Sequence, residues 1–194
     1  MIRALPIRIA AAAAVLALVL VGLVVRENGA RAAGREVLLP MEAVDPRDLL
    51  SGHYVALRLS QRLPLGLPCP KEASAYESGR WIGLQPADGH HRYAGVGATR
   101  QAALAGGADV AVRGGVYCSR MALGNADADV VTLDIGVDRF HADQDEAQAI
   151  DKALAQRRPG EAPSAFAVVS VGQDGRARLK GVIVGGKRTD LTWW

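Results

Sequence analysis

Four histidines are the residues of this chain with the most versatile chemistry, because an imidazole can bind a metal ion or transfer a proton. They are His53, His90, His91 and His141. One hypothesis is an exported metal-binding or hydrolytic domain that uses His53 with His90, His91 or His141. Against it, His90 and His91 are adjacent, and adjacent residues of a strand point to opposite faces. No His-x-His or His-x-x-x-His spacing occurs, so we predict no metal site and keep this hypothesis as the alternative.

Serine, aspartate and glycine residues offer other kinds of chemistry, each without a supporting motif. Ser51 and Ser119 lie in neither a Gly-x-Ser-x-Gly nor a Ser-x-x-Lys pattern. The glycine-rich stretches at 95–97 and 105–108 match no phosphate-binding pattern. The carboxylates available for an acid–base pair are Asp127 with Asp129 and Asp134 with Asp138. Solvent-facing positions on antiparallel strands explain them more simply. We predict no catalytic residue, no cofactor and no enzymatic activity.

The two cysteines, Cys69 and Cys118, are the only thiols of the chain. Two thiols in an oxidising compartment commonly pair, and these two show no metal-binding spacing. We therefore predict a disulfide between them. Two separate buried thiols are the alternative.

The elements that must position these residues begin with an apolar N-terminal run. Residues 9–25 contain no charge and no strongly polar group. At about 1.5 Å per helical residue, this run just spans a hydrocarbon core of about 30 Å. We predict a cytoplasmic segment at 1–8 and a single transmembrane anchor in the lipid bilayer at 9–25. Arg3 and Arg8 precede the run, which favours an inside N-terminus in a bacterial inner membrane and a body in the periplasm.

A cleaved signal peptide is the alternative to an anchor. The sequence Ala-Arg-Ala ending at Ala32 has the small-x-small pattern of a cleavage site, and cleavage there would release a soluble periplasmic binding module. The apolar run exceeds the usual 7–15 residues of a signal peptide, so we favour the anchor. In both cases the body is exported.

The composition of the body argues against nucleic acid as a partner. Without Arg3 and Arg8, 21 basic residues face 20 acidic ones, and no basic cluster stands out. Hydrophobic residues make up 49% of the 194 residues and aromatic residues only 5%, so we expect one aliphatic core.

Hydrophobic and polar residues alternate through most of the body, which we place at 35–194 after a flexible linker at 26–34. This pattern predicts strands at 36–42, 53–60, 80–86, 91–97, 109–118, 129–140, 166–171 and 176–184. Asp88-Gly89 and Asp174-Gly175 predict hairpin turns, and residues 124–129 predict a looser polar connection. We expect a mainly β fold, an antiparallel sandwich or barrel.

One segment breaks the alternation. Residues 143–158 carry acidic residues in the first turn and two arginines in the last, as a helix dipole prefers, and Pro159-Gly160 follows. The pattern predicts a single surface helix packed on the sheet.

The stretch from 44 to 59 predicts a strand, one capped helical turn, a glycine and a second strand. Asp45 suits an N-cap, Pro46 the first helical position, and Asp48 the first turn, while Gly52 suits the end of the turn. Local structure therefore accounts for nearly every residue of this stretch.

The same stretch resembles the GDYXXLXY family, short bacterial membrane-anchored proteins with the pattern Asp-Pro-Arg-Asp-Leu-x-x-Gly-Asp-Tyr-x-x-Leu-x-Tyr. His53 replaces the motif aspartate and Leu59 replaces the last tyrosine. Residues 134–140 and 173–181 resemble further segments of the family. The matching motif residues are Asp45, Pro46, Arg47, Asp48, Leu49, Gly52, Tyr54 and Leu57.

The resemblance implies one N-terminal helix, a β-rich extracytoplasmic domain and no known activity. Members of the family look paired with polytopic membrane proteins of unknown function. We therefore expect a non-enzymatic accessory or interaction module that acts with such a protein. The resemblance also implies that His53, in place of the aspartate, bonds the preceding turn through its imidazole. Catalysis that needed that carboxylate is not expected here.

Overall fold

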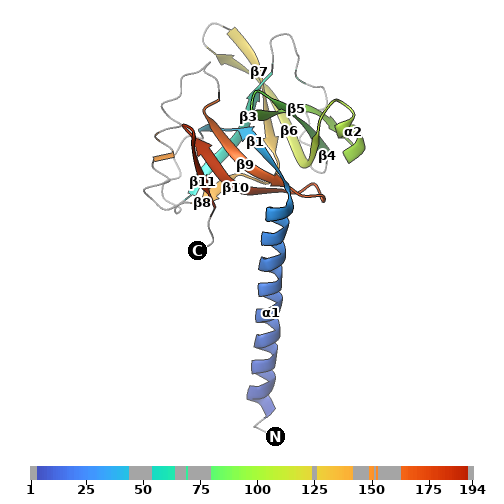
Figure 1. Cartoon of the computed structure of the whole chain (residues 1–194), viewed down its shortest axis with the longest axis vertical. Helices are drawn as coiled ribbons and strands as arrows, with labels where there is room; N and C mark the ends of the chain where they lie inside the picture. Colours follow the sequence, from blue (N-terminus) through green and yellow to red (C-terminus); the bar gives the residue numbers. More distant parts are fainter. Residues whose placement is uncertain are drawn as a thin grey trace.

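A computed structural model of the chain describes residues 4–43, 54–63, 69, 80–123, 126–141, 149–150, 152 and 163–191. A long helix, α1 (Ala4–Ala33), extends away from a β-rich body and runs directly into the first strand (Figure 1). The predicted turn at 45–52, His53 and most of the helix predicted at 143–158 lie outside the described residues. Residues 149, 150 and 152 of that segment are helical, and Ile150 is buried.

The described part of the body consists of strands and one short helix. In chain order they are β1 (Arg35–Pro40), β2 (Glu42–Ala43), β3 (Tyr54–Arg62), β4 (Arg80–Ala87), β5 (His90–Gly97), α2 (Arg100–Leu104), β6 (Val110–Leu123), β7 (Ala126–Asp134), β8 (Arg139–His141), β9 (Ala165–Val171), β10 (Ala177–Val184) and β11 (Lys187–Asp190).

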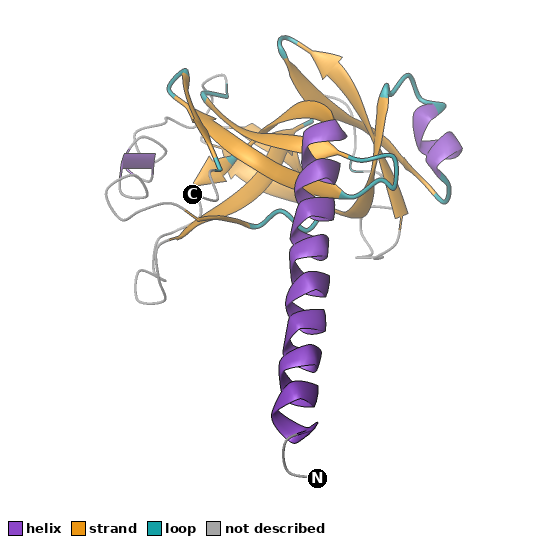
Figure 2. Cartoon of the chain, turned by 60° about the horizontal axis from the view of Figure 1, so that its bottom comes forward, coloured by secondary structure: helices purple, strands orange, loops and turns teal. Residues whose placement is uncertain are grey.

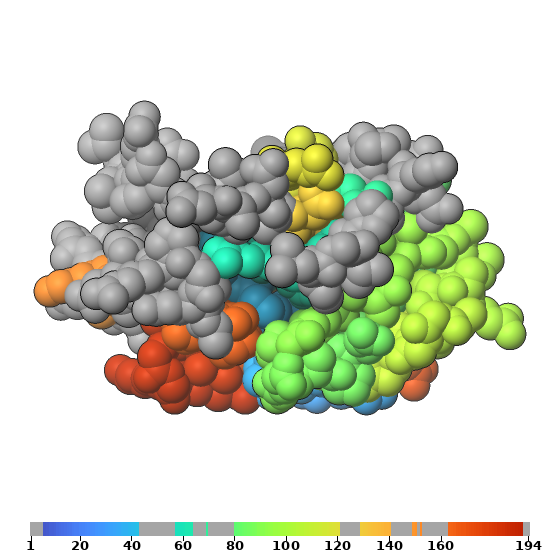
Figure 3. All heavy atoms as spheres, turned by 90° about the horizontal axis from the view of Figure 1, so that it is seen from above, coloured from blue at the N-terminus to red at the C-terminus, as the bar shows by residue number. Residues whose placement is uncertain are grey.

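The strands form two antiparallel sheets in a sandwich-like body, as the alternating pattern predicted (Figure 2). The smaller sheet has the order β1-β9-β10-β11, and the larger has the order β2-β3-β7-β6-β4-β5, with β8 paired to β3. Only Met41 separates β1 from β2, so one extended segment passes from the first sheet into the second. Figure 3 views the side opposite α1, where β4 and β5 lie beside β9–β11.

The core between the sheets is aliphatic, as the low aromatic content predicted. Its least exposed side chains include Val37, Leu39, Leu59, Val112, Val131 and Val169. Burial alternates along β1, where Val37 and Leu39 face the core and Glu36 faces solvent. This period of two is the signal that identified the strands in the sequence.

Both predicted hairpin turns are confirmed. Asp88 and Gly89 have φ values of 52° and 78°, and they connect the paired strands β4 and β5. Gly175 has φ 77° between β9 and β10. Glycine and aspartate tolerate this left-handed region better than β-branched residues do, which is why Asp-Gly is a reliable hairpin signal.

The predicted linker at 26–34 differs from the structure, because α1 continues through Ala33. Alanine, arginine and glutamate dominate these residues and favour helix, which offsets the cost of about 1 kcal/mol for Gly29. The body is therefore joined to the helix by Gly34 alone, without a flexible spacer.

Three further details of the β pattern were wrong or missed. The predicted strand at 129–140 is divided into β7 and β8, since Gly136 has φ 74° and turns the chain. Residues 126–129, predicted as part of a loose connection, belong to β7 and pair with 120–123 of β6. The short elements α2 and β11 carried too few residues for a recognisable period.

Candidate functional site at the junction of helix and body

Gly34 joins α1 to β1 at a point where the chain touches β9. A Cβ atom at this position would lie 2.1 Å from Ser170 Oγ and 3.0 Å from the carbonyl oxygen of Val171. A larger side chain would fit only if the Ser170 hydroxyl rotated away and the Val171 backbone or the helix end shifted. Glycine therefore permits the close approach that seats the helix end against the smaller sheet.

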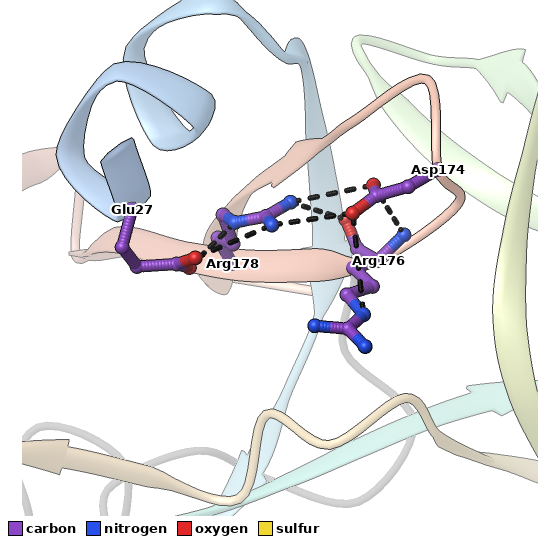
Figure 4. A network of polar contacts seen from close by, with 4 residues as sticks. All are labelled: Glu27, Asp174, Arg176 and Arg178. Carbon is purple, nitrogen blue, oxygen red and sulfur yellow. Dashed lines mark hydrogen bonds and ion pairs between the residues drawn. The ribbon is translucent and has the colours of Figure 1, made fainter. Parts of the chain in front are cut away.

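An arginine from β10 fastens the helix to the sheet (Figure 4). Arg178 Nε donates to Glu27 Oε1 at 2.6 Å, and Nη2 donates to Glu27 Oε2 at 3.4 Å. The same guanidinium donates to both carboxylate oxygens of Asp174, at 3.4 and 3.3 Å. It also donates to the carbonyl oxygen of Arg176 at 3.4 Å. We call Glu27, Asp174 and Arg178 the junction cluster.

Burial and charge show how firmly Arg178 is held. Its side chain is only 10% exposed, whereas those of Glu27 and Asp174 are 57% and 48% exposed. Hydrogen bonding to Glu27, then to Asp174, raises the pKa of Arg178. The bond from Arg178, followed by the backbone N–H of Arg176, lowers the pKa of Asp174. All three guanidinium nitrogens have protein acceptors, so the cluster positions the helix rather than binding an external anion.

A second cluster crosses the outer face of the same sheet. Glu36 on β1 accepts bonds of 2.8 Å from Lys180 Nζ and from Arg188 Nη1 on β11. Arg188 Nε also donates to Asp190 Oδ1 at 2.8 Å. The bonds from Arg188 and Lys180 lower the pKa of Glu36 to about 2. We call Glu36, Lys180, Arg188 and Asp190 the sheet cluster.

A third group combines a histidine with an ion pair. Arg35 at the start of β1 pairs with Asp109, and its Nη1 donates to the Asp109 carbonyl at 3.1 Å. Burial lowers the pKa of the nearby His91, although the charge of Asp109 opposes the shift. Within the described chain, His91 Nδ1 and Asp109 Oδ1 are buried and lack a hydrogen-bond partner. Asp109 Oδ1 is an acceptor, and His91 Nδ1 donates or accepts according to the tautomer of the neutral ring, so one water can satisfy both atoms.

The structure does not bring the predicted histidines together where it describes them. His90 is buried, its Nδ1 lies 3.2 Å from the Asp88 carbonyl, and its ring centroid is 5.5 Å from that of Phe166. His141 lies on β8, where its backbone pairs with Tyr54. Among the residues searched, no group of three or more His, Cys, Asp or Glu could hold a metal ion. His53, which the metal-binding or hydrolytic hypothesis needs, lies outside the described residues.

The predicted serine and carboxylate candidates occupy separate places. Asp134 Oδ1 accepts a bond from the Gly136 N–H at 3.4 Å, and the Asp138 side chain is exposed beside Arg139. Asp129 pairs with Arg120 at 3.2 Å on the β6–β7 hairpin. Ser119 lies on β6 opposite Val130. Asp127 and Ser51 have side chains outside the described set.

The predicted disulfide is present. Cys69 is bonded to Cys118 on β6, with the two Cα atoms 5.7 Å apart. The bond ties the segment that follows β3 to the middle of the larger sheet. A disulfide suggests that the body is extracytoplasmic.

The described half of the sequence motif is a strand of the larger sheet. Leu57 is 6% exposed and its N–H donates to the Asp138 carbonyl at 2.8 Å. Leu59 is 1% exposed and pairs with Leu133 of β7. The apolar leucine that replaces the motif tyrosine is therefore a core residue. The motif residues from Asp45 to His53 lie outside the described residues.

A family model described as GDYXXLXY protein matches residues 16–182. The chain belongs to the GDYXXLXY family. No curated protein and no solved structure matches it. The match begins inside α1 and ends in β10, so both Glu27 and Arg178 of this GDYXXLXY protein lie within the matched range.

The junction cluster was missed at the sequence level. Glu27 and Arg178 are 151 positions apart, and each has an ordinary local setting for a charged residue. Neither a period nor a spacing connects an exposed glutamate near a helix end with an arginine in a distant strand. The sequence pointed to this part of the chain through the Asp174-Gly175 turn, the strand predicted at 176–184 and the family resemblance of 173–181, but none of these indicated a contact with α1.

Proposed function

We propose that this protein is a membrane-anchored accessory module whose body lies on the extracytoplasmic side and acts with a polytopic membrane protein. The observation that carries the proposal is the rigid, directed attachment of an exposed apolar helix to the body. Both the process and the partner go beyond the family assignment.

The surface of α1 supports the membrane part of the proposal. Residues 6–33 form a helix long and apolar enough to cross a membrane, and its most apolar window is 0% buried in the body. Its large apolar side chains, including Leu18, Leu20 and Val25, are 54–72% exposed. An apolar surface of this size is unfavourable in water, and a bilayer covers it.

The attachment of the helix supports the accessory role. Gly34 and the junction cluster fix the direction in which the body leaves α1, so the body presents the same faces to whatever lies beside the helix. A module held in one orientation at the membrane suits a partner that is itself embedded there.

Fractionation and purification of the tagged, full-length protein test the proposal. We expect α1 to be retained in the intact mass, the protein to resist carbonate extraction from membranes, and its two cysteines to be unreactive until reduced. Affinity purification in mild detergent should then recover the same polytopic membrane protein in repeated preparations. Loss of residues 1–32, or no reproducible membrane protein, would contradict the proposal.

A further inference from the structure

The attachment of α1 places one hairpin of the body at the level of lipid headgroups, provided that the helix spans the bilayer as proposed above. The 30 residues of α1 extend about 45 Å, close to the 40–45 Å of a bilayer with its headgroup layers. The apolar residues 9–25 occupy the middle, so residues 26–33 lie in the outer headgroup layer. Glu27 is bonded there to Arg178, which carries the β9–β10 turn at 172–176 to the same level (Figure 4).

The two segments at this level carry a net positive charge. Residues 26–34 and 172–178 contain four arginines and two acidic residues, Glu27 and Asp174. Both of these carboxylates are bonded to Arg178. Arg176 is 75% exposed, and its Nε lies 4.0 Å from Asp174 Oδ2, so most of its surface faces solvent.

A tryptophan and a fifth arginine continue this surface beyond the turn. The Arg113 N–H donates to the Gly175 carbonyl at 2.8 Å, and the Arg113 guanidinium carbon lies 4.9 Å from the centre of the Trp81 ring. A Cβ on Gly175 would lie 2.3 Å from Trp81, so the turn packs directly on the indole. Indoles and arginines are both favoured at the membrane interface.

We propose that Arg26, Arg113 and Arg176, together with Trp81, form a surface that binds the phosphates of anionic lipids. We call these four residues the basic rim. A guanidinium matches the oxygens of a phosphate group with two parallel hydrogen bonds. Bound lipid holds the body down on the bilayer, so the anchored module has one fixed face toward the membrane and one away from it.

Hydrogen exchange in nanodiscs tests the basic rim on the full chain. Purified protein with its α1 confirmed by intact mass is placed in discs of neutral phosphatidylcholine and in discs that also contain phosphatidylglycerol. We expect peptides covering 172–178 to exchange at least about five-fold more slowly in the anionic discs, the effect of about one arginine at such a surface. High salt should remove this difference, because it screens exposed charges.

Matched variants show whether the rim itself causes the protection. Arg176→Glu should abolish the difference between the two lipids, and Arg176→Gln should reduce it without adding repulsion toward Asp174. Arg120→Glu is the control, since Arg120 is 71% exposed, pairs with Asp129, and belongs to the hairpin that lies farthest from α1 (Figure 1). Equal exchange in both lipids, or the same loss in the control, would overturn the proposal.

Failure of the basic rim and failure of the proposed function give different results. Cleavage of α1 in the cell would contradict the anchored module, but discs containing the intact chain would still report whether the rim binds anionic lipid. A chain retained in the membrane with no lipid-dependent protection would contradict only the basic rim.

Discussion

The junction cluster and the sheet cluster each contain a glutamate–arginine ion pair, but the two pairs have different roles. In each, a glutamate near the start of the body meets an arginine from the C-terminal strands, 151 positions away for Glu27 and Arg178 and 152 for Glu36 and Arg188. The first pair crosses from a helix to a sheet, and the second crosses a single sheet. The comparison separates what an ion pair does for orientation from what it does for stability.

Backbone hydrogen bonds account for the difference. Across the sheet cluster, β1, β9, β10 and β11 are already joined by antiparallel pairing, which is interrupted only by a register shift between Leu179 and Gly181 of β10. Between α1 and the sheet no strand pairing exists, so side chains and the close contact at Gly34 hold the angle. Arg178 is accordingly the more buried of the two arginines, at 10% exposure against 38% for Arg188.

Gly34→Leu should have the largest effect, because it disturbs the contact that separates the junction cluster from the sheet cluster. The added side chain meets Ser170 and Val171, so β1 and β9 must separate at their ends or α1 must move. We expect a loss of about 3 kcal/mol in the free energy of unfolding, the upper range for overpacking, measured by urea denaturation in mild detergent. Gly29→Leu is the control, because nothing lies within 4 Å of that position and leucine favours helix. Equal losses in both variants would show that Gly34 is not a steric contact.

Arg178→Met and Arg188→Met compare the two clusters directly. Arg178→Met should cost about 2 kcal/mol, because the side chain is buried and leaves two carboxylates without their partner. Arg188→Met should cost about 1 kcal/mol, in the range of surface pairs. Hydrogen exchange of residues 28–35 should rise in the first variant and stay unchanged in the second. A rise in both variants would show that the sheet cluster also fixes the helix.

Acid should weaken the sheet cluster through Glu36. Its pKa is about 2 in the folded protein against 4.5 ordinarily, so its contribution is complete above pH 4.5 and is lost as the pH falls from 4.5 toward 2. Because the side chain is 36% exposed, solvent screening reduces this contribution to about 1 kcal/mol. Unfolding at a series of pH values should show this slope, and Glu36→Gln should flatten it. An unchanged slope in the variant would assign acid sensitivity to other carboxylates.

The smallest expected effect comes from His91. Burial lowers its pKa below 6.5, so the unfolded chain binds the proton more readily and stability falls as the pH drops below 6.5. The charge of Asp109 opposes this shift, which keeps the effect small. The pKa of His91, followed by NMR of its ring protons, should rise in His90→Gln, because the charge of His90 also lowers it. A pKa of His91 at or above 6.5 in the unmodified protein would contradict the assigned cause.

Local sequence was sufficient for most elements of the fold. Alternation along β1 and β3, the short apolar run of β9 and the turns at Asp88-Gly89 and Asp174-Gly175 depend on neighbouring residues, so they could be predicted directly. Periodicity could not show that Gly136 divides one strand into β7 and β8, because its positive φ interrupts pairing without changing the apolar pattern. The continuation of α1 through 26–33 was missed because Gly29 resembles a linker residue, although its alanine and arginine neighbours favour helix.

The sequence by itself determined that this chain has an apolar N-terminal helix, a β-rich aliphatic body and the GDYXXLXY motif. Each depends on residue types at short, regular spacings. Only the tertiary structure decided that Arg178 meets Glu27, that Gly34 admits the helix end against β9, and that the Gly175 turn packs on Trp81. These contacts join residues far apart in the chain, and antiparallel pairing brings them together in ways that local periodicity does not encode.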